Sequence, residues 1–241
     1  MKRGTLELKQ IVDAVEMLRN RISERFPASG LASHSSELLG FAQTLQNNGK
    51  KLVRVSIGIR IGSWLGGASV IALILVPYFL LVKTQSGIET LPNFLQSLEA
   101  VITVIAGTSA AVIAMISIKR SHIRRKALGL LQELREMAHV IDMLQFSKSP
   151  AVVMFPLKAT ASSRPSSENL SAPEMFRYLS YCGDRSALIG KLAVVIGGWV
   201  PDPAVLSTAD AVEDLASDLE RKMLSKLLLL EQLNQRIKPI Q

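Results

Sequence analysis

The fold of this chain is decided by two apolar stretches, IGSWLGGASVIALILVPYFLLV at residues 61–82 and AVITVIAGTSAAVIAMISI at residues 100–118. Neither contains Asp, Glu, Lys, Arg or His. At ~1.5 Å of rise per residue, helices of these lengths reach roughly 33 and 29 Å, which matches a hydrocarbon core about 30 Å thick. The sequence therefore predicts a hairpin of two membrane-spanning helices at residues 61–118. A buried hairpin of a soluble protein is the less favoured alternative, because such helices rarely run so long without a charge.

Positive charge flanks the predicted hairpin on one side. The segment between the two apolar stretches, residues 83–99, carries only Lys83, Glu89 and Glu99. Because short cytoplasmic flanks of membrane proteins are rich in Lys and Arg, we expect both termini in the cytoplasm and this segment outside. The basic residues on which the predicted topology depends are Lys50, Lys51, Arg54, Arg60, Lys119, Arg120, Arg124, Arg125 and Lys126.

The chain has 241 residues, is 48% hydrophobic and carries a formal net charge of +8. Basic residues near a membrane attract anionic headgroups, by about 1 kcal/mol each, so the lipid bilayer is the first expected partner. Nucleic acid is not expected, because the topology already explains these cations and no aromatic residues alternate with them. Cys182 is the only cysteine, which excludes an intrachain disulfide and predicts a buried thiol that packs as a small apolar side chain.

The N-terminal region, residues 1–60, is predicted to hold cytoplasmic helices. Apolar residues at heptad spacing form the first helix, which Phe26-Pro27 ends: Leu8, Ile11, Val15, Leu18 and Ile22. This stripe pairs either in a coiled coil or, more simply, with other helices of the chain. A second helix is predicted to begin at a cap formed by Ser33 or Ser35 and to stop at Asn47-Asn48-Gly49. It would bury Leu38, Leu39, Ala42 and Leu45.

Small residues recur at every fourth position in both apolar regions. Such spacing lets helix backbones approach closely in lipid. Two uses remain open, contact between the two spans of one chain or a specific oligomer. The residues are Gly58, Gly62 and Gly66 in the first region and Ala106, Gly107, Ala110, Ala111 and Ala114 in the second.

The helical pattern continues beyond the second apolar stretch into a stem at residues 119–146. Its predicted apolar stripe is Leu130, Leu134, Met137, Ile141 and Leu144, so that residues 100–146 form one helix. Glu136, His139 and Asp142 follow at a spacing of three, which places a carboxylate, an imidazole and a carboxylate on one helix face. Di-iron bundles present metal ligands in this way. The simpler interpretation is a hydrogen bond from His139 to Asp142 within a helical bundle.

Residues 147–172 are rich in Ser, Ala and Pro and are predicted to be a linker. Residues 173–241 are predicted to form a helical pair that packs on the bundle. Pro173 opens the first helix, and Asp202 caps the second with Pro203 at its first position. The first helix would bury Met175, Tyr178, Leu179, Cys182, Leu188 and Ile189. The second would end at Ile237 and bury Leu206, Val212, Leu215, Leu219, Met223 and residues 227–230.

Three phrases of the sequence look familiar together: RFPASGL at residues 25–31, AHVIDMLQFSKSP at 138–150 and RYLSYC at 177–182. With them the chain resembles an uncharacterised family of bacterial two-span membrane proteins, whose central motif reads AHVIDMHQLTKDP. The resemblance implies a multi-pass protein of the bacterial inner membrane. This chain departs from the motif at Leu144 and Ser149, so a polar or metal site there would lack a His and a carboxylate. In layout alone, the hairpin with cytoplasmic helices also resembles SLATT effectors of bacterial conflict systems.

The sequence thus predicts an all-α integral membrane protein, with no cofactor and no catalytic residue. No Gly-rich phosphate loop, zinc-type Cys/His spacing or Ser/His/Asp arrangement is recognisable. The favoured function is a non-enzymatic scaffold or signalling protein at the inner membrane, acting through a partner protein or as a homo-oligomer. An oligomeric channel or membrane-acting effector is the alternative, and a metal-binding bundle that uses Glu136, His139 and Asp142 is a second alternative.

Overall fold

The computed structural model describes residues 7–49, 67, 71, 75, 91–146, 148–150 and 170–237. Every regular element in these ranges is an α-helix, which confirms the predicted all-α class for this part of the chain. The chain divides into two units, residues Met1–Lys50 with Ala127–Gln241, and residues Lys51–Lys126. Most of the predicted first span lies outside the described residues, which include only residues 67, 71 and 75 of it. Also outside are the predicted packing glycines Gly58, Gly62 and Gly66, the basic residues Lys50, Lys51, Arg54 and Arg60, and most of the predicted linker.

Helix α1 spans Leu8–Arg25 and buries the predicted heptad stripe from Ile11 to Ile22. A second helix follows at residues 30–49. Its cap is Ser29, whose Oγ accepts a hydrogen bond from the Ala32 N–H at 3.2 Å, and not Ser33 or Ser35 as predicted. Ser35 lies inside the helix, where its hydroxyl donates to the Leu31 carbonyl at 2.6 Å. The cap therefore stands directly after the Phe26-Pro27 break.

The predicted end of this helix, Asn47-Asn48-Gly49, is helical up to Gly49, and residue 50 lies outside the described residues. The reason for a glycine here is a tertiary contact. A Cβ on Gly49 would come within 2.3 Å of the Trp199 indole ring, so only glycine admits this approach. Gly49 is therefore a packing residue.

Helix α3 spans Leu91–Phe146 and contributes residues to both units. The structure confirms one unbroken helix through residues 100–146, but the helix starts earlier, within the segment predicted to be an external loop. Pro92 stands in its first turn, where a missing N–H has no helical partner to lose. Among the described residues, α3 is the one helix that is long and apolar enough to cross a membrane. Its most apolar stretch of 18 residues has a mean hydropathy of 1.8 and contains no buried residue.

Residues 127–146 of α3 pack through an apolar stripe that is rotated around the helix axis from the predicted stripe. Leu134 and Ile141 are fully buried, as predicted, whereas Leu130, Met137 and Leu144 are only half-buried. Small residues decide the rotation, because a helix with alanine on its contact face can approach its neighbours closely. The buried stripe is Ala127, Leu131, Leu134, Ala138, Ile141 and Gln145.

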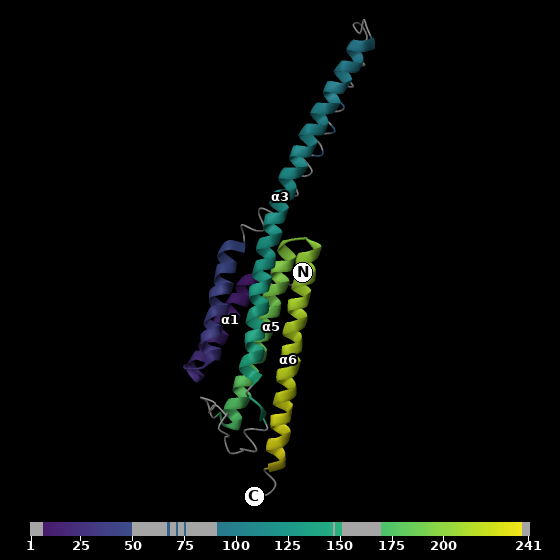
Figure 1. The fold of residues 1–241 in the computed structure, drawn as a ribbon. Helices are drawn as coiled ribbons and strands as arrows, with labels where there is room; N and C mark the ends of the chain where they lie inside the picture. The colour runs from purple at the N-terminus through teal and green to yellow at the C-terminus, as the bar shows by residue number, and fades with distance from the viewer. Residues whose placement is uncertain are drawn as a thin grey trace, which may run out of the picture. The chain divides into compact units, whose positions relative to one another are not determined.

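Helices α5 (Ala172–Trp199) and α6 (Pro203–Ile237) form the predicted C-terminal pair and run in opposite directions (Figure 1). A capping box of Ser171 and Glu174 opens α5, with Pro173 in its first turn. The turn between the helices is as predicted, since the Asp202 carboxylate accepts the Ala204 N–H at 3.0 Å. Three residues predicted to be buried on α6 are exposed, namely Leu206 at 44%, Leu228 at 52% and Leu229 at 43%. The buried face of α6 runs through Val205, Ala209, Val212, Met223 and Leu230 instead.

Glycines set the spacing of α5 and α6. Gly183, Gly190 and Gly197 recur every seven residues on α5 and face α6. Cβ atoms built on them would lie 3.7 Å from Met223, 3.2 Å from Ala216 and 2.9 Å from Ala209, in that order. The two backbones therefore approach most closely beside the turn that connects them. This heptad of glycines is a signal that the sequence analysis missed.

Candidate functional site

The three phrases that carry the resemblance lie in contact at one end of the first unit. Phe26, from the first phrase, packs edge-on against Tyr178 and Tyr181 of the third, with ring centroids 5.6 and 6.3 Å apart. The central phrase joins them through Lys148, whose Nζ lies 5.5 Å from the centre of the Tyr178 ring. This cation–π contact stabilises the side chain of Lys148, which is almost fully buried.

Gly30 brings the helix at residues 30–49 against the end of α3. A Cβ at this position would lie 3.0 Å from a methyl carbon of Leu144. Leu144 is also one of the two positions at which this chain departs from the resembled motif. Here Leu144 acts as a packing residue.

A polar cluster joins the end of α3 to α6. We use this name for Asp142, Gln145 and Lys148 together with Lys222 and Lys226 of α6. The Lys226 ammonium donates to the Gln145 carbonyl at 2.8 Å, to the Gln145 side-chain oxygen and to the Lys148 carbonyl at 3.4 Å. These carbonyls belong to the last turn of α3 and the residues after it, which no intrahelical N–H satisfies. Lys226 therefore caps α3 from a neighbouring helix, and its partial burial lowers its pKa.

Asp142 holds the other half of the polar cluster. Its carboxylate accepts hydrogen bonds from Lys222 Nζ and from the Gln145 side-chain amide, both at 2.6 Å. The hydrogen bond from Lys222 is the main cause that lowers the pKa of Asp142. Asp142 thus pairs with a cation of α6 rather than with His139. The pair adds a polar contact between α3 and α6.

The other two members of the proposed metal set are solvent-facing. Glu136 accepts a hydrogen bond from Gln132 at 3.3 Å, and His139 is exposed. Within the ranges that the structure describes, no group of three or more His, Cys, Asp or Glu side chains is placed to hold a metal ion. The structure brings Asp142 into an interhelical contact and leaves Glu136 and His139 on the outer surface of α3.

Arg185 is a fully buried guanidinium on α5 that the sequence analysis did not single out. Its Nη2 donates to the His34 carbonyl at 2.9 Å, while Nε and Nη1 find no hydrogen-bond partner among the described residues. Burial lowers the pKa of Arg185 to about 10. Cys182, one turn before it, is buried as predicted, and burial raises the pKa of its thiol to about 12. A thiol with such a pKa stays protonated and is a poor nucleophile.

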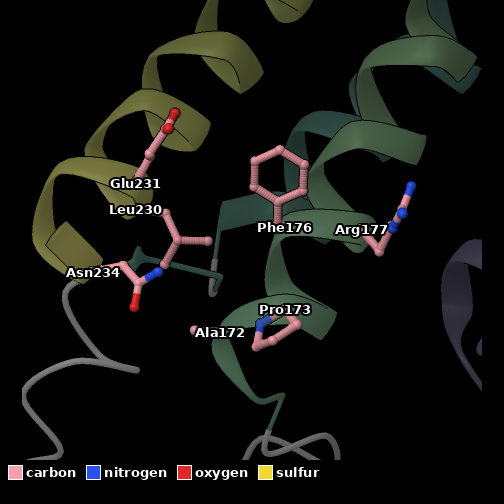
Figure 2. A pocket seen from close by; sticks show the side chains of 7 residues that line it. All are labelled: Ala172, Pro173, Phe176, Arg177, Leu230, Glu231 and Asn234. Atoms are coloured by element: carbon pink, nitrogen blue, oxygen red, sulfur yellow. The ribbon is translucent and has the colours of Figure 1, made fainter. Parts of the chain in front are cut away.

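Two shallow grooves lie along the seam between α5 and α6. The first, of about 500 Å³, is lined by Phe176 of α5 and by Leu230 and Glu231 of α6, which Figure 2 shows from close by. The second, of about 520 Å³, includes Gly183, Leu224 and Leu227. Exposed apolar side chains line these grooves, with 42% of Phe176 and 56% of Leu224 accessible.

In the second unit, the apolar part of α3 is exposed. Accessible fractions reach 58% at Ile102, 64% at Ile113 and 70% at Ile118. The Thr103 hydroxyl donates a hydrogen bond to the Glu99 carbonyl at 2.9 Å, and the Thr108 hydroxyl donates one to the Val104 carbonyl at 2.8 Å. The predicted packing residues Ala106, Gly107, Ala110, Ala111 and Ala114 are all exposed, and so are the predicted topology residues Lys119, Arg120, Arg124, Arg125 and Lys126.

The fold and these contacts define the class: an all-helical protein in which one helix combines an exposed apolar segment with a packed segment. Comparisons with protein families, with curated proteins and with solved structures find no match for this chain.

Three residues of the site have no counterpart in the sequence analysis: Lys222, Lys226 and Arg185. A signal for Lys226 exists, because it occupies a position of the buried α6 stripe between Met223 and Leu230. A lysine at such a position needs acceptors from another helix. Arg185 likewise stands among the buried positions of α5.

Proposed function

We propose that this chain is a non-catalytic scaffold of the bacterial inner membrane, anchored through α3, with its first unit in the cytoplasm. The observation that carries the proposal is the change of environment along α3. At residues 102–118 its apolar side chains are exposed, whereas from Ala127 to Gln145 one face is buried. Exposed apolar side chains such as Val104, Ile113 and Ile118 on a helix of this length match the lipid phase better than water.

The polar cluster supports a scaffold rather than a simple anchor. Asp142 and Lys226 tie the last turn of α3 to α6, so the helix that enters the membrane is held by the C-terminal pair. A force or a displacement applied to the α5–α6 pair is therefore transmitted to α3. The exposed apolar side chains beside the α5–α6 seam provide surface for a partner.

The proposed topology is multi-pass, with both termini cytoplasmic. Its support is the second apolar stretch at residues 61–82 and the basic flanks of the sequence. A tag fused to either terminus should be digested by protease in inverted inner-membrane vesicles and protected in intact spheroplasts. If one tag is digested in inverted vesicles and the other in intact spheroplasts, the two termini lie on opposite sides of the membrane and the proposed topology is wrong.

The scaffold part of the proposal is tested by crosslinking in native membranes followed by mass measurement in detergent. We expect a specific complex, either with a second copy or with a partner protein, that persists after solubilisation. A monomer of 26.3 kDa without any crosslinked species would contradict the scaffold function. Leu224→Glu should weaken the complex if the α5–α6 seam takes part, with Met17→Glu, another exposed apolar position, as the matched control.

An oligomeric channel or membrane-acting effector is the second candidate, favoured by one observation. Gly107 has open space beside it, and its small neighbours on α3 are exposed, so this face is accessible to another helix. Purified chain reconstituted in liposomes would then conduct ions, and Gly107→Leu would abolish conduction. Liposomes that stay ion-tight at every protein density would remove this candidate.

A further inference from the structure

Two apolar side chains at the end of α3 are exposed in the first unit. Of the large apolar side chains that the structure describes, Phe146 and Met143 are the most exposed, with 83% and 77% of their surfaces accessible. Both lie far beyond the apolar segment at residues 102–118, so a membrane that holds this segment would not cover them. Neighbouring apolar side chains with this exposure indicate a surface for a partner.

The spacing of these residues is that of a helix that pairs with another helix. His139, Met143 and Phe146 follow one another at steps of four and three residues, and all three are exposed. Alternating steps of three and four form the contact stripe of a coiled coil. At about 100° per residue, they lie on a different side of α3 from the buried residues Ile141 and Gln145. We call His139, Met143 and Phe146 the outer stripe.

We propose that a second copy of this chain covers the outer stripe, with the two α3 helices parallel and side by side. This inference rests on the proposed membrane anchoring. Two copies in one membrane enter it in the same direction, so like positions of their α3 helices face each other. Met143 and Phe146 of both copies then form one apolar cluster. Anchoring in the same membrane also raises the effective concentration of the second copy, so a short contact surface suffices.

The charges at the edge of the outer stripe favour a second copy as the partner. Glu136 continues the same spacing by one step and is exposed, as is Arg135 beside it. In a parallel pair, each contact residue inserts between four residues of the facing helix. For Glu136 these four include Arg135 and His139 of the second copy, both of which carry or can carry positive charge. At this edge Glu136 stays in contact with water, so the charges contribute more to the choice of partner than to affinity.

The test is disulfide formation between copies in native membranes. His139→Cys and Phe146→Cys, each introduced alone, should give a product with the mass of two chains, because like positions of a parallel pair lie close enough for a disulfide. An antiparallel pair would link position 139 to position 146 and would require both cysteines. Cys182 is fully buried and provides no accessible thiol. Met17→Cys, at an exposed position on α1, is the matched control and should remain a single chain.

Variants of the surrounding residues test how the second copy is recognised, with the disulfide at position 146 as the readout. Met143→Glu should reduce the linked fraction roughly tenfold, because it places a charge in the apolar cluster. Met17→Glu should leave the fraction unchanged. Glu136→Arg should reduce it roughly threefold, since like charges then face each other across the pair. The double change Arg135→Glu with Glu136→Arg should restore it.

Absence of a self-linked product at both positions, in a chain that is embedded in the membrane, would overturn the pair and leave the membrane scaffold standing. A chain missing from the membrane fraction would overturn the proposed function instead. A photoreactive label attached at position 143 identifies the occupant of the outer stripe, and we expect an adduct of two copies. An adduct with a different protein, or one within a single chain, would overturn the inference.

Discussion

Single glycines control how closely α5 and α6 approach. The distance from a Cβ added at each glycine to the nearest atom of α6 decreases from 3.7 Å at Gly183 to 3.2 Å at Gly190 and 2.9 Å at Gly197. Glycine destabilises a helix by about 1 kcal/mol relative to alanine. At each position an alanine would therefore stabilise the helix itself but bring its methyl group against α6. The neighbours at the two narrow positions are alanine Cβ atoms, which cannot rotate away.

Alanine substitutions at these glycines should therefore have graded effects. Gly183→Ala should raise the free energy of unfolding by about 0.5–1 kcal/mol, because the added methyl group makes an ordinary contact. Gly190→Ala should leave the free energy of unfolding nearly unchanged. Gly197→Ala should lower the free energy of unfolding by about 1–3 kcal/mol through overpacking. Urea unfolding followed by circular dichroism measures the order.

Gly40→Ala is the control for the glycine series, since it lies within a helix and nothing lies within 4 Å of its added Cβ. It should stabilise the protein as much as Gly183→Ala does. Equal gains at all four positions would show that the helices are not held at the spacing described.

Arg185 is the residue with the least favourable surroundings. Among the described residues, its guanidinium makes one hydrogen bond, to the His34 carbonyl, and two of its nitrogens are buried without a partner. A buried charge without a carboxylate carries a large desolvation cost.

Arg185→Met should raise the free energy of unfolding by about 1–2 kcal/mol. The gain from removing the buried charge exceeds the loss of one hydrogen bond, which is about 1 kcal/mol. Thermal unfolding of the detergent-solubilised chain tests this. Arg177→Met, an exposed change on the same helix, should leave stability unchanged, and a clear loss at Arg185 would show that its hydrogen bond to His34 organises the core.

At the scale of the helices, the polar cluster decides how α3 is held. Asp142 pairs with Lys222, and about half of each side chain is exposed, which limits the strength of the pair to about 1 kcal/mol. Because the folded state lowers the pKa of Asp142, the stability from this pair is present above the unfolded pKa of about 4 and is lost as the pH falls through the lower folded value.

Asp142→Asn should therefore destabilise the protein at neutral pH by up to about 1 kcal/mol, and the difference from the parent chain should shrink as the pH falls below about 4. Urea unfolding at a series of pH values measures both effects. Asp218→Asn is the matched control, because Asp218 pairs with Arg221 on the same helix and joins no second element. A destabilisation that stays constant down to the lowest pH would contradict the role of the Asp142 charge.

Local signals predicted most of the elements. The Phe26-Pro27 break, the Asp202 cap and the heptad stripe of α1 follow from backbone chemistry and periodicity, and the structure confirms all three. The features that failed depend on contacts between helices. The close contact between Gly49 and the Trp199 ring is one example, and the rotation of α3, which depends on the small residues Ala127 and Ala138, is another.

The candidate site was less predictable for the same reason. The spacing in the sequence associates Asp142 with His139, but its partner in the structure is Lys222 of α6, eighty positions later in the sequence. Periodicity along one helix cannot show which residues of another helix lie opposite. Only the lysine within the buried stripe of α6, Lys226, indicates from the sequence that a second helix must supply acceptors.

At the scale of the whole molecule, the proposed function requires that α3 lies in two environments. Val104, Ile113 and Met115 are exposed in the structure, and so are Gln132 and Glu136 on the same helix. Protein packing alone would therefore leave all five equally reachable by a reagent in water. Only a lipid phase would distinguish the first three from the last two.

Single-cysteine labelling in native membranes tests this directly. Cys182 is fully buried, so a cysteine introduced at each of the five positions provides the accessible thiol. With a membrane-impermeant maleimide, we expect no labelling at positions 104, 113 and 115 until the membrane is dissolved, and prompt labelling at 132 and 136 in opened membranes. Equal labelling at all five positions in intact bilayers would contradict the claim that α3 enters the membrane.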